Sequence, residues 1–168
     1  MGGEGSPAAA SGGRLSARER FLAGAEELGL APEILRFPEG TRTAEQAAAA
    51  VGCELGQIVK SLVFLCDGQP VLALTSGANR VDTERLGTVL DGKITRADAD
   101  GVREATGYAI GGTPPFGHAQ PLRAVVDPAL LAYDVVWAAA GTPETVFELT
   151  PGELVQASDA EVADFAAA

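Results

Sequence analysis

The sequence predicts an α+β fold: a mixed β-sheet with surrounding helices, built as a single domain. Segments typical of helices and of strands are intermixed without the regular strand–helix–strand alternation of a parallel α/β sheet. The chain has 168 residues, 46% of them hydrophobic, which is enough to bury one core. No stretch approaches the ~18 consecutive apolar residues of a membrane span. We therefore expect a cytoplasmic protein without a membrane partner.

Residues 1–14 consist largely of Gly, Ala, Ser and Pro, which bring little apolar surface to offset the entropy of ordering. They also lack the basic start and apolar centre of a signal peptide. We expect residues 1–14 to form a disordered N-terminal tail and residues 15–168 to form the folded domain.

The first predicted helix begins at the capping box of Ser16 and Glu19 and ends at Gly29. A short strand follows at residues 33–37. The second helix begins at Thr43, with Gln46 completing its capping box, and ends at Gly52.

Two apolar runs, residues 59–65 and 70–75, flank Asp67-Gly68, a dipeptide that strongly favours a hairpin turn. Asp82 is placed to cap a helix that runs through Leu90, and Asp98 caps another that ends near Gly107. The strands predicted after this point are residues 122–127, 133–140 and 145–149. A last helix, residues 150–157, has Thr150 and Glu153 as its capping box and Pro151 in its first turn.

Charge and composition exclude several classes of function. The formal net charge is −11, so the protein should not bind nucleic acid non-specifically, and a nucleic-acid partner would need a local basic patch or a chemically distinct end. Cys53 and Cys66 have no CxxC spacing and His118 is the single histidine, so we expect free thiols and no metal. Phosphate-loop, GxSxG and HExxH motifs are absent, and we expect no cofactor.

Lys60 is one of two lysines and lies in an otherwise apolar strand. It has two interpretations. The ordinary one is a lysine that packs its stem on the core and keeps its ammonium in water. The functional one is a cation at the mouth of a pocket, directed at an anionic or carbonyl oxygen. Arg80 could face the same site, although a surface salt bridge would explain it equally well.

The segment "GYAIGGTPPFGH", residues 107–118, is the second candidate. Its glycines allow a ligand to approach backbone N–H groups, and Pro114-Pro115 stiffens the chain. It is either a pocket wall that binds a carbonyl or carboxylate, or an ordinary connector. Twelve residues with this composition make a costly connector, which favours the pocket wall.

These two segments, "IVKSLVFLCDGQPVLALTSGANRVDTERL" and "GYAIGGTPPFGH", resemble the YbaK/ProX family of trans-acting aminoacyl-tRNA deacylases, which are related to the editing domain of bacterial prolyl-tRNA synthetases. The resemblance extends from about Leu15 to Phe165. It implies a YbaK/ProX-like domain that hydrolyses the ester of a mischarged aminoacyl-tRNA. The implied partners are the 3′ aminoacyl-adenosine end of that tRNA and, as a further candidate, an aminoacyl-tRNA synthetase.

The resemblance assigns the catalytic position to Lys60, which would hold the terminal phosphate or the ester carbonyl while water attacks. Two positions depart from the Cys-tRNA(Pro) deacylases of the family: Phe37 replaces a tyrosine and Val146 an aspartate. The expected substrate contacts are Ser61, Gly111, Gly112, Pro114, Pro115, Phe116, Gly117, His118, Phe37, Thr43, Ser76 and Arg80. Two alternatives stay open: a non-catalytic module that binds an aminoacyl or adenosine end, and a pocket for a small metabolite.

Overall fold

The computed structural model describes residues 15–39, 41 and 43–168, and the predicted tail lies outside the described residues. The predicted α+β class is confirmed, because helices surround mixed β-structure. The described strands divide into two sheets, however, and not the one sheet that the sequence predicts. A five-stranded mixed sheet has the order β4-β2-β3-β5-β8, and a three-stranded antiparallel sheet has the order β1-β7-β6.

The α-helices begin and end where local signals predict. Ser16 and Thr43 form the predicted capping boxes of the first two helices, and Thr150 forms that of the last. Asp82 and Asp98 accept N–H bonds at the starts of the two helices between them. The helices are α2 (Ala17–Glu27), α3 (Ala44–Val51), α4 (Thr83–Leu90), α5 (Ala99–Thr106) and α6 (Pro151–Ser158).

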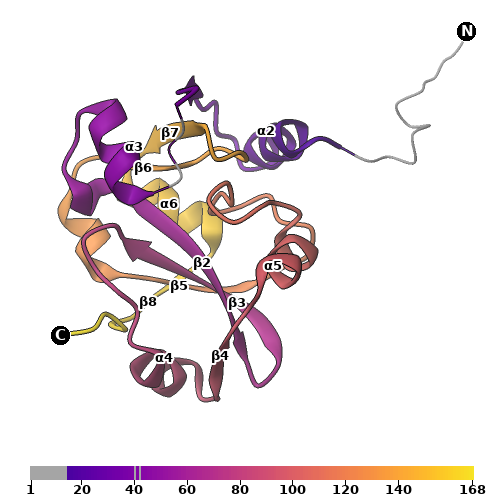
Figure 1. Ribbon diagram of the computed structural model, residues 1–168, viewed down its shortest axis with the longest axis vertical. Helices are drawn as coiled ribbons and strands as arrows, with labels where there is room; N and C mark the ends of the chain where they lie inside the picture. Colours follow the sequence, from indigo (N-terminus) through magenta and orange to yellow (C-terminus); the bar gives the residue numbers. More distant parts are fainter. Residues whose placement is uncertain (1–14, 40, 42) are drawn as a thin grey trace, which may run out of the picture.

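Strands β2 (Val59–Cys66) and β3 (Gln69–Ser76) form the predicted hairpin. Asp67 and Gly68 both have positive φ, at 50° and 84°, as a tight two-residue hairpin turn requires. In Figure 1 this hairpin runs through the molecule, with α4 and β4 (Ile94–Arg96) near one end and α3, β6 (Val136–Ala139) and β7 (Thr145–Leu149) near the other.

Several short elements are not predicted by the sequence, and one strand is shorter than expected. Of the strand predicted at residues 133–140, only β6 forms in the structure, because a 3₁₀-helix, η2 (Pro128–Ala132), and a bend precede it. The other short elements are β4, β8 (Glu161–Val162) and a further 3₁₀-helix, η1 (Leu55–Gln57). Strands β1 (Leu35–Arg36) and β5 (Arg123–Val126) lie within the predicted segments.

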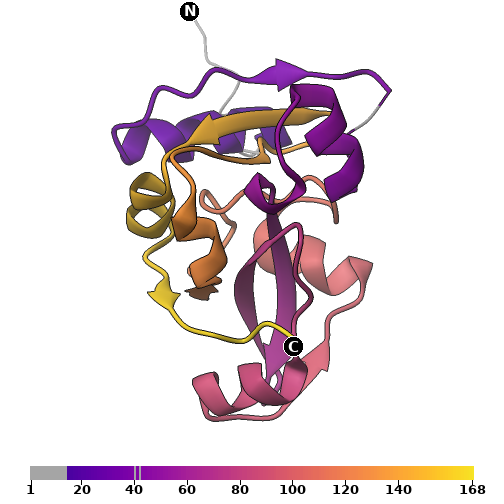
Figure 2. The same cartoon turned by 90° about the vertical axis from the view of Figure 1, so that its left-hand side faces the viewer.

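The main core lies between the two sheets and α2. Phe21, Phe116 and Phe147 form its aromatic centre, with ring centroids 4.9–5.8 Å apart. A second cluster lies under α4, where Phe165 of the C-terminal segment is fully buried. Figure 2 shows α2 along one side of the three-stranded sheet and the C-terminal segment returning towards α4.

No helix among the described residues is both long and apolar enough to cross a membrane.

Candidate functional site

A cavity of about 750 Å³ opens where the two sheets separate. Ile58, directly before β2, and Trp137 of β6 form an isolated parallel bridge, and the described residues of β2 and β6 otherwise pair within different sheets. Because β4 pairs only with Phe64–Cys66, no strand of the described ranges pairs with the first half of β2 on the side away from β3. Every residue from Ile58 to Phe64 lines the cavity, although alternate side chains of a strand point to opposite faces. The cavity therefore borders the open edge of β2 as well as its face.

Lys60 lines this cavity and is half-buried. Its Nζ donates a hydrogen bond of 2.6 Å to the backbone carbonyl of Asn79. Burial is the main cause that lowers the pKa of Lys60, and Arg80 adds to this effect, while the charges of Glu45 and Asp127 oppose it. Lys60 is thus a partly desolvated amine with one fixed hydrogen bond and further N–H donors for a ligand.

Ser61 also lines the cavity, and its hydroxyl is buried. Among the described residues, Ser61 Oγ has no hydrogen-bond partner. Leaving a buried hydroxyl unpaired costs about 1–3 kcal/mol. A polar ligand group in the cavity would relieve that cost.

The charges along the cavity contrast with those of the chain. Of the described residues that line it, three are basic, namely Lys60, Arg80 and Arg96, and none is acidic. Arg80 and Arg96 are exposed, and within the described part of the chain neither guanidinium has a hydrogen bond or ion pair. In a protein of net charge −11, this is a local basic site of the kind that an anionic ligand needs.

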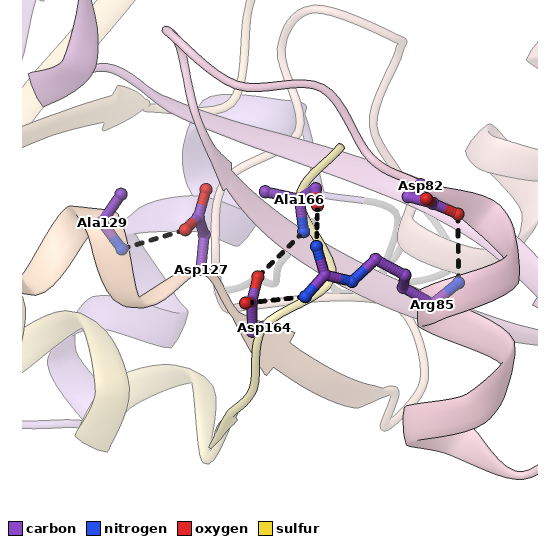
Figure 3. Close-up of polar contacts among 6 residues, drawn as sticks. All are labelled: Asp82, Arg85, Asp127, Ala129, Asp164 and Ala166. Atoms are coloured by element: carbon purple, nitrogen blue, oxygen red, sulfur yellow. Dashed lines mark hydrogen bonds and ion pairs between the residues drawn. The ribbon is translucent and has the colours of Figure 1, made fainter. Parts of the chain in front are cut away.

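Arg80 belongs to a segment that the C-terminal residues hold in place. Ala167 N donates to Arg80 O (2.8 Å), and Asp82 N donates to Phe165 O (2.8 Å). Figure 3 shows that the Arg85 side chain of α4 reaches Asp164 and the carbonyl of Ala166. The start of α4 and the C-terminal segment therefore support the segment on which Arg80 lies.

The glycine- and proline-rich loop contributes its first half to the cavity. Ile110, Gly111 and Thr113 line it, and Gly111 has a positive φ of 87°. Within the described residues, the N–H groups of Gly111 and Thr113 donate to no protein acceptor, whereas Gly112 N donates to Ala109 O (3.0 Å). Two backbone donors are thus available near the cavity wall.

The second half of the loop packs into the protein. Pro114, Pro115 and Phe116 are buried, and none of them lines the cavity. His118 Nε2 donates to Pro114 O (2.7 Å), because a carbonyl can only accept, and burial lowers the pKa of His118. Tyr108 Oη donates to Gly117 O (2.9 Å). These contacts brace the loop.

Gly112 has a packing role. A Cβ at this position would lie 2.9 Å from backbone atoms of Thr142. Glycine therefore lets the loop approach the turn between β6 and β7 closely.

Three further residues expected to contact the substrate lie at different places relative to the cavity. Thr43 lines the cavity and also caps α3. Ser76 is buried, and its Oγ donates to Gly56 O (2.9 Å), so it holds a turn. Phe37 does not line the cavity, but Val146, the other departure from the Cys-tRNA(Pro) deacylases, does.

Among the cavity residues that were not expected, Arg96 and Trp137 have the side chains best able to contact a ligand. Arg96 lies in the three-residue strand β4, opposite Phe64, and nothing in its local sequence marks it. The sequence suggests that Trp137 is a core residue, but the structure shows it half-buried along the cavity. No group of three or more His, Cys, Asp or Glu side chains in the described ranges could hold a metal ion.

Comparison with known proteins adds three findings. The family model of the aminoacyl-tRNA editing domain matches residues 38–157. The uncharacterized protein YwhH of Bacillus subtilis is 33% identical over 131 residues, 77% of this chain and 83% of YwhH. A solved structure titled "Crystal structure of a putative trans-editing enzyme for prolyl tRNA synthetase" is 44% identical, covers 92% of this chain and 100% of its own, and superposes with a TM-score of 0.86.

Proline–tRNA ligases are also similar to this chain over part of their length. The enzyme of Lactobacillus gasseri is 32% identical over 129 residues. That match covers 76% of this chain but only 22% of the ligase, so the similarity is confined to about a fifth of the larger enzyme.

Proposed function

Because the chain belongs to the aminoacyl-tRNA editing domain family, we propose that it is a deacylase that hydrolyses the ester of mischarged aminoacyl-tRNA in trans. One observation above all supports this proposal. The cavity is lined by Lys60, Arg80 and Arg96 with no acidic side chain among its described residues, in a strongly acidic protein. An anionic polymer whose reactive ester is itself uncharged fits a site of this kind, since phosphates would meet the arginines while the ester enters the cavity.

The proposed reaction is attack of water on the ester carbonyl, with release of the amino acid and of the ribose hydroxyl of the terminal adenosine. The oxyanion that forms needs positive charge or N–H donors. Lys60 would supply the charge, and Gly111 and Thr113 are the candidates for backbone donors. Removing one such donor typically lowers the rate by ~10²–10³-fold.

We assign Lys60 to charge stabilisation, because the ammonium is the ordinary form of a lysine side chain near neutral pH. Burial lowers the pKa of Lys60, and the charges of Glu45 and Asp127 oppose this effect. The buried hydroxyl of Ser61 lies beside it in the sequence and could bond the substrate. The protein's contribution would then be to position the ester and to stabilise charge, with water as the nucleophile.

The test is a deacylation screen over a panel of mischarged tRNAs. We expect Lys60→Ala to lower hydrolysis by orders of magnitude while the unfolding temperature changes little. Lys60→Arg should rescue only in part, because the guanidinium keeps the charge but is larger and forked. Lys93→Ala is the matched control, since Lys93 is the other lysine and does not line this cavity.

Two results would contradict the proposal. One is a Lys60→Ala variant that hydrolyses an accepted tRNA at the wild-type rate. The other is a wild-type protein that binds aminoacyl-tRNA but hydrolyses none of the panel, which would favour a binding module.

A further inference from the structure

The ammonium of Lys60 bonds to a turn that a buried carboxylate holds from the other side. We propose that Asp127, acting through Asn79, is a positioning residue that sets the location of Lys60 Nζ in the cavity. The inference rests on the proposed function for its kinetic test, but its structural test is independent of any activity.

The first link is the hydrogen bond from Lys60 Nζ to Asn79 O, at 2.6 Å. A lysine side chain has several rotatable bonds, so its tip is located only where something holds it. In the described structure, this carbonyl is the one hydrogen-bond acceptor of Lys60 Nζ. The location of Nζ therefore depends on how firmly Asn79 is held.

The second link is the turn from Ser76 to Asn79. Asn79 N donates to Ser76 O (2.9 Å), which closes the turn. Asn79 Nδ2 donates to Asp127 Oδ2 (2.9 Å), and Ser76 N donates to the same oxygen (3.1 Å). One carboxylate oxygen thus binds both ends of the turn that presents the carbonyl to Lys60.

The third link is Asp127 itself, which is only 2% exposed. Its other oxygen, Oδ1, accepts a bond from Ala129 N (2.9 Å) at the start of η2, as Figure 3 shows. Capping that short helix needs only this oxygen. Since an uncompensated buried charge is costly, devoting Oδ2 to the turn indicates a second role for the side chain.

The turn is also tied to the strand that carries Lys60. Gly77 N donates to Ile58 O (2.7 Å), two residues before Lys60. A Cβ on Gly77 would lie 2.5 Å from Leu55 O, so the turn packs tightly against this segment. The Asn79 carbonyl is therefore held between β2 on one side and Asp127 on the other.

The charges around Lys60 are consistent with this role. The titratable and charged groups that act on it are Glu45 of α3, Arg80 and Asp127, of which Arg80 lowers the Lys60 pKa and the two acids raise it. Asp127 would thus hold the amine in place and favour its ammonium form.

The structural test is a titration of lysine side chains by NMR. Lysine labelled with ¹³C at Cε gives two signals, because the chain has two lysines, and Lys93 serves as an internal reference. Asp127→Asn should lower the Lys60 pKa below its wild-type value, because a negative charge that favours the ammonium is removed. Asn79→Ala, which leaves the Asp127 charge in place, should increase the motion of Lys60 Cε. Neither substitution should alter the Lys93 signal.

The kinetic test uses the same variants. Asn79→Ala should lower kcat by up to ~10²-fold, the cost of a small misplacement of a catalytic group, with a smaller change in KM. Thr150→Ala is the control for destabilisation, because it removes the capping box of α6 and Thr150 does not line the cavity. It should lower the unfolding temperature without altering Lys60 or kcat.

An unchanged Lys60 titration in Asp127→Asn, together with an unchanged Lys60 relaxation in Asn79→Ala, overturns the inference. If Asp127→Asn does not fold, the relaxation of Lys60 in Asn79→Ala alone decides whether the inference holds. A wild type without deacylase activity refutes the proposed function, and the NMR result then judges the positioning role separately.

Discussion

Replacing Arg96 by alanine should weaken the binding of an aminoacyl-RNA end and reduce its dependence on salt. Arg96 lies opposite Phe64 in the sheet, whereas Arg80 is near enough to Lys60 to influence its pKa. Phe64 lies four residues after Lys60, which corresponds to ~13 Å along β2. Given this spacing, we expect each arginine to face a different phosphate.

The magnitude follows from counterion release. Each phosphate contact on a single strand contributes about −0.7 to the slope of log K against log salt concentration, so the two arginines predict about −1.4 and one arginine predicts about −0.7. Between ~50 and ~200 mM salt, the wild type should then lose roughly 7-fold in affinity and Arg96→Ala roughly 2.6-fold. Removing Arg80 as well should bring the slope close to zero.

The assay is fluorescence anisotropy with a short RNA that ends in CCA and carries an amide-linked amino acid, which cannot be hydrolysed. Arg18→Ala is the matched control, because Arg18 is an exposed arginine that does not line the cavity. It should retain the wild-type slope. Equal slopes for wild type and Arg96→Ala would refute the assignment of Arg96 to a phosphate.

Two further predictions concern the loop after α5. Gly112→Ala should destabilise the protein by about 1–3 kcal/mol in urea unfolding, because its Cβ would lie 2.9 Å from the backbone of Thr142. The control Gly152→Ala, with no atom nearer than 3.9 Å, should stabilise by about 0.4–1 kcal/mol, and equal shifts would contradict the packing argument. Burial lowers the pKa of His118 from its ordinary 6.5, so its unfolded form binds the proton more readily. The neutral ring should therefore stabilise the fold above about pH 6.5, a contribution lost as the pH falls through the lower folded pKa. In His118→Gln, the urea midpoint should depend less on pH below about pH 6.5 than it does in the wild type. An unchanged pH dependence would argue against a contribution from His118.

The local structure of this protein could be predicted because its signals act within a few residues. The Ser16, Thr43 and Thr150 capping boxes each join residues three apart. The Asp67-Gly68 turn likewise needs only its own positive φ angles. Helices and the central hairpin therefore follow from neighbouring residues alone.

Short strands and the division into two sheets could not be predicted in this way. Strands β4 and β8 have three and two residues, too few to show a hydrophobic period. They exist because β2 and β5 supply partners that lie far away in the sequence. The assignment of β2 and β6 to different sheets, both of which line the cavity, likewise depends on long-range pairing.

The same contrast between local signals and long-range packing applies to the candidate site. The sequence by itself identified Lys60 as an unusual charge and residues 107–118 as an unusual loop, because composition and position are visible in one dimension. Only the tertiary structure decided that Gly111 lines the cavity while Phe116 is buried in the core. It also decided that Arg96 lines the same cavity as Lys60. The reason is physical: which side chain reaches a cavity depends on how distant segments pack and pair, and no local pattern encodes that choice.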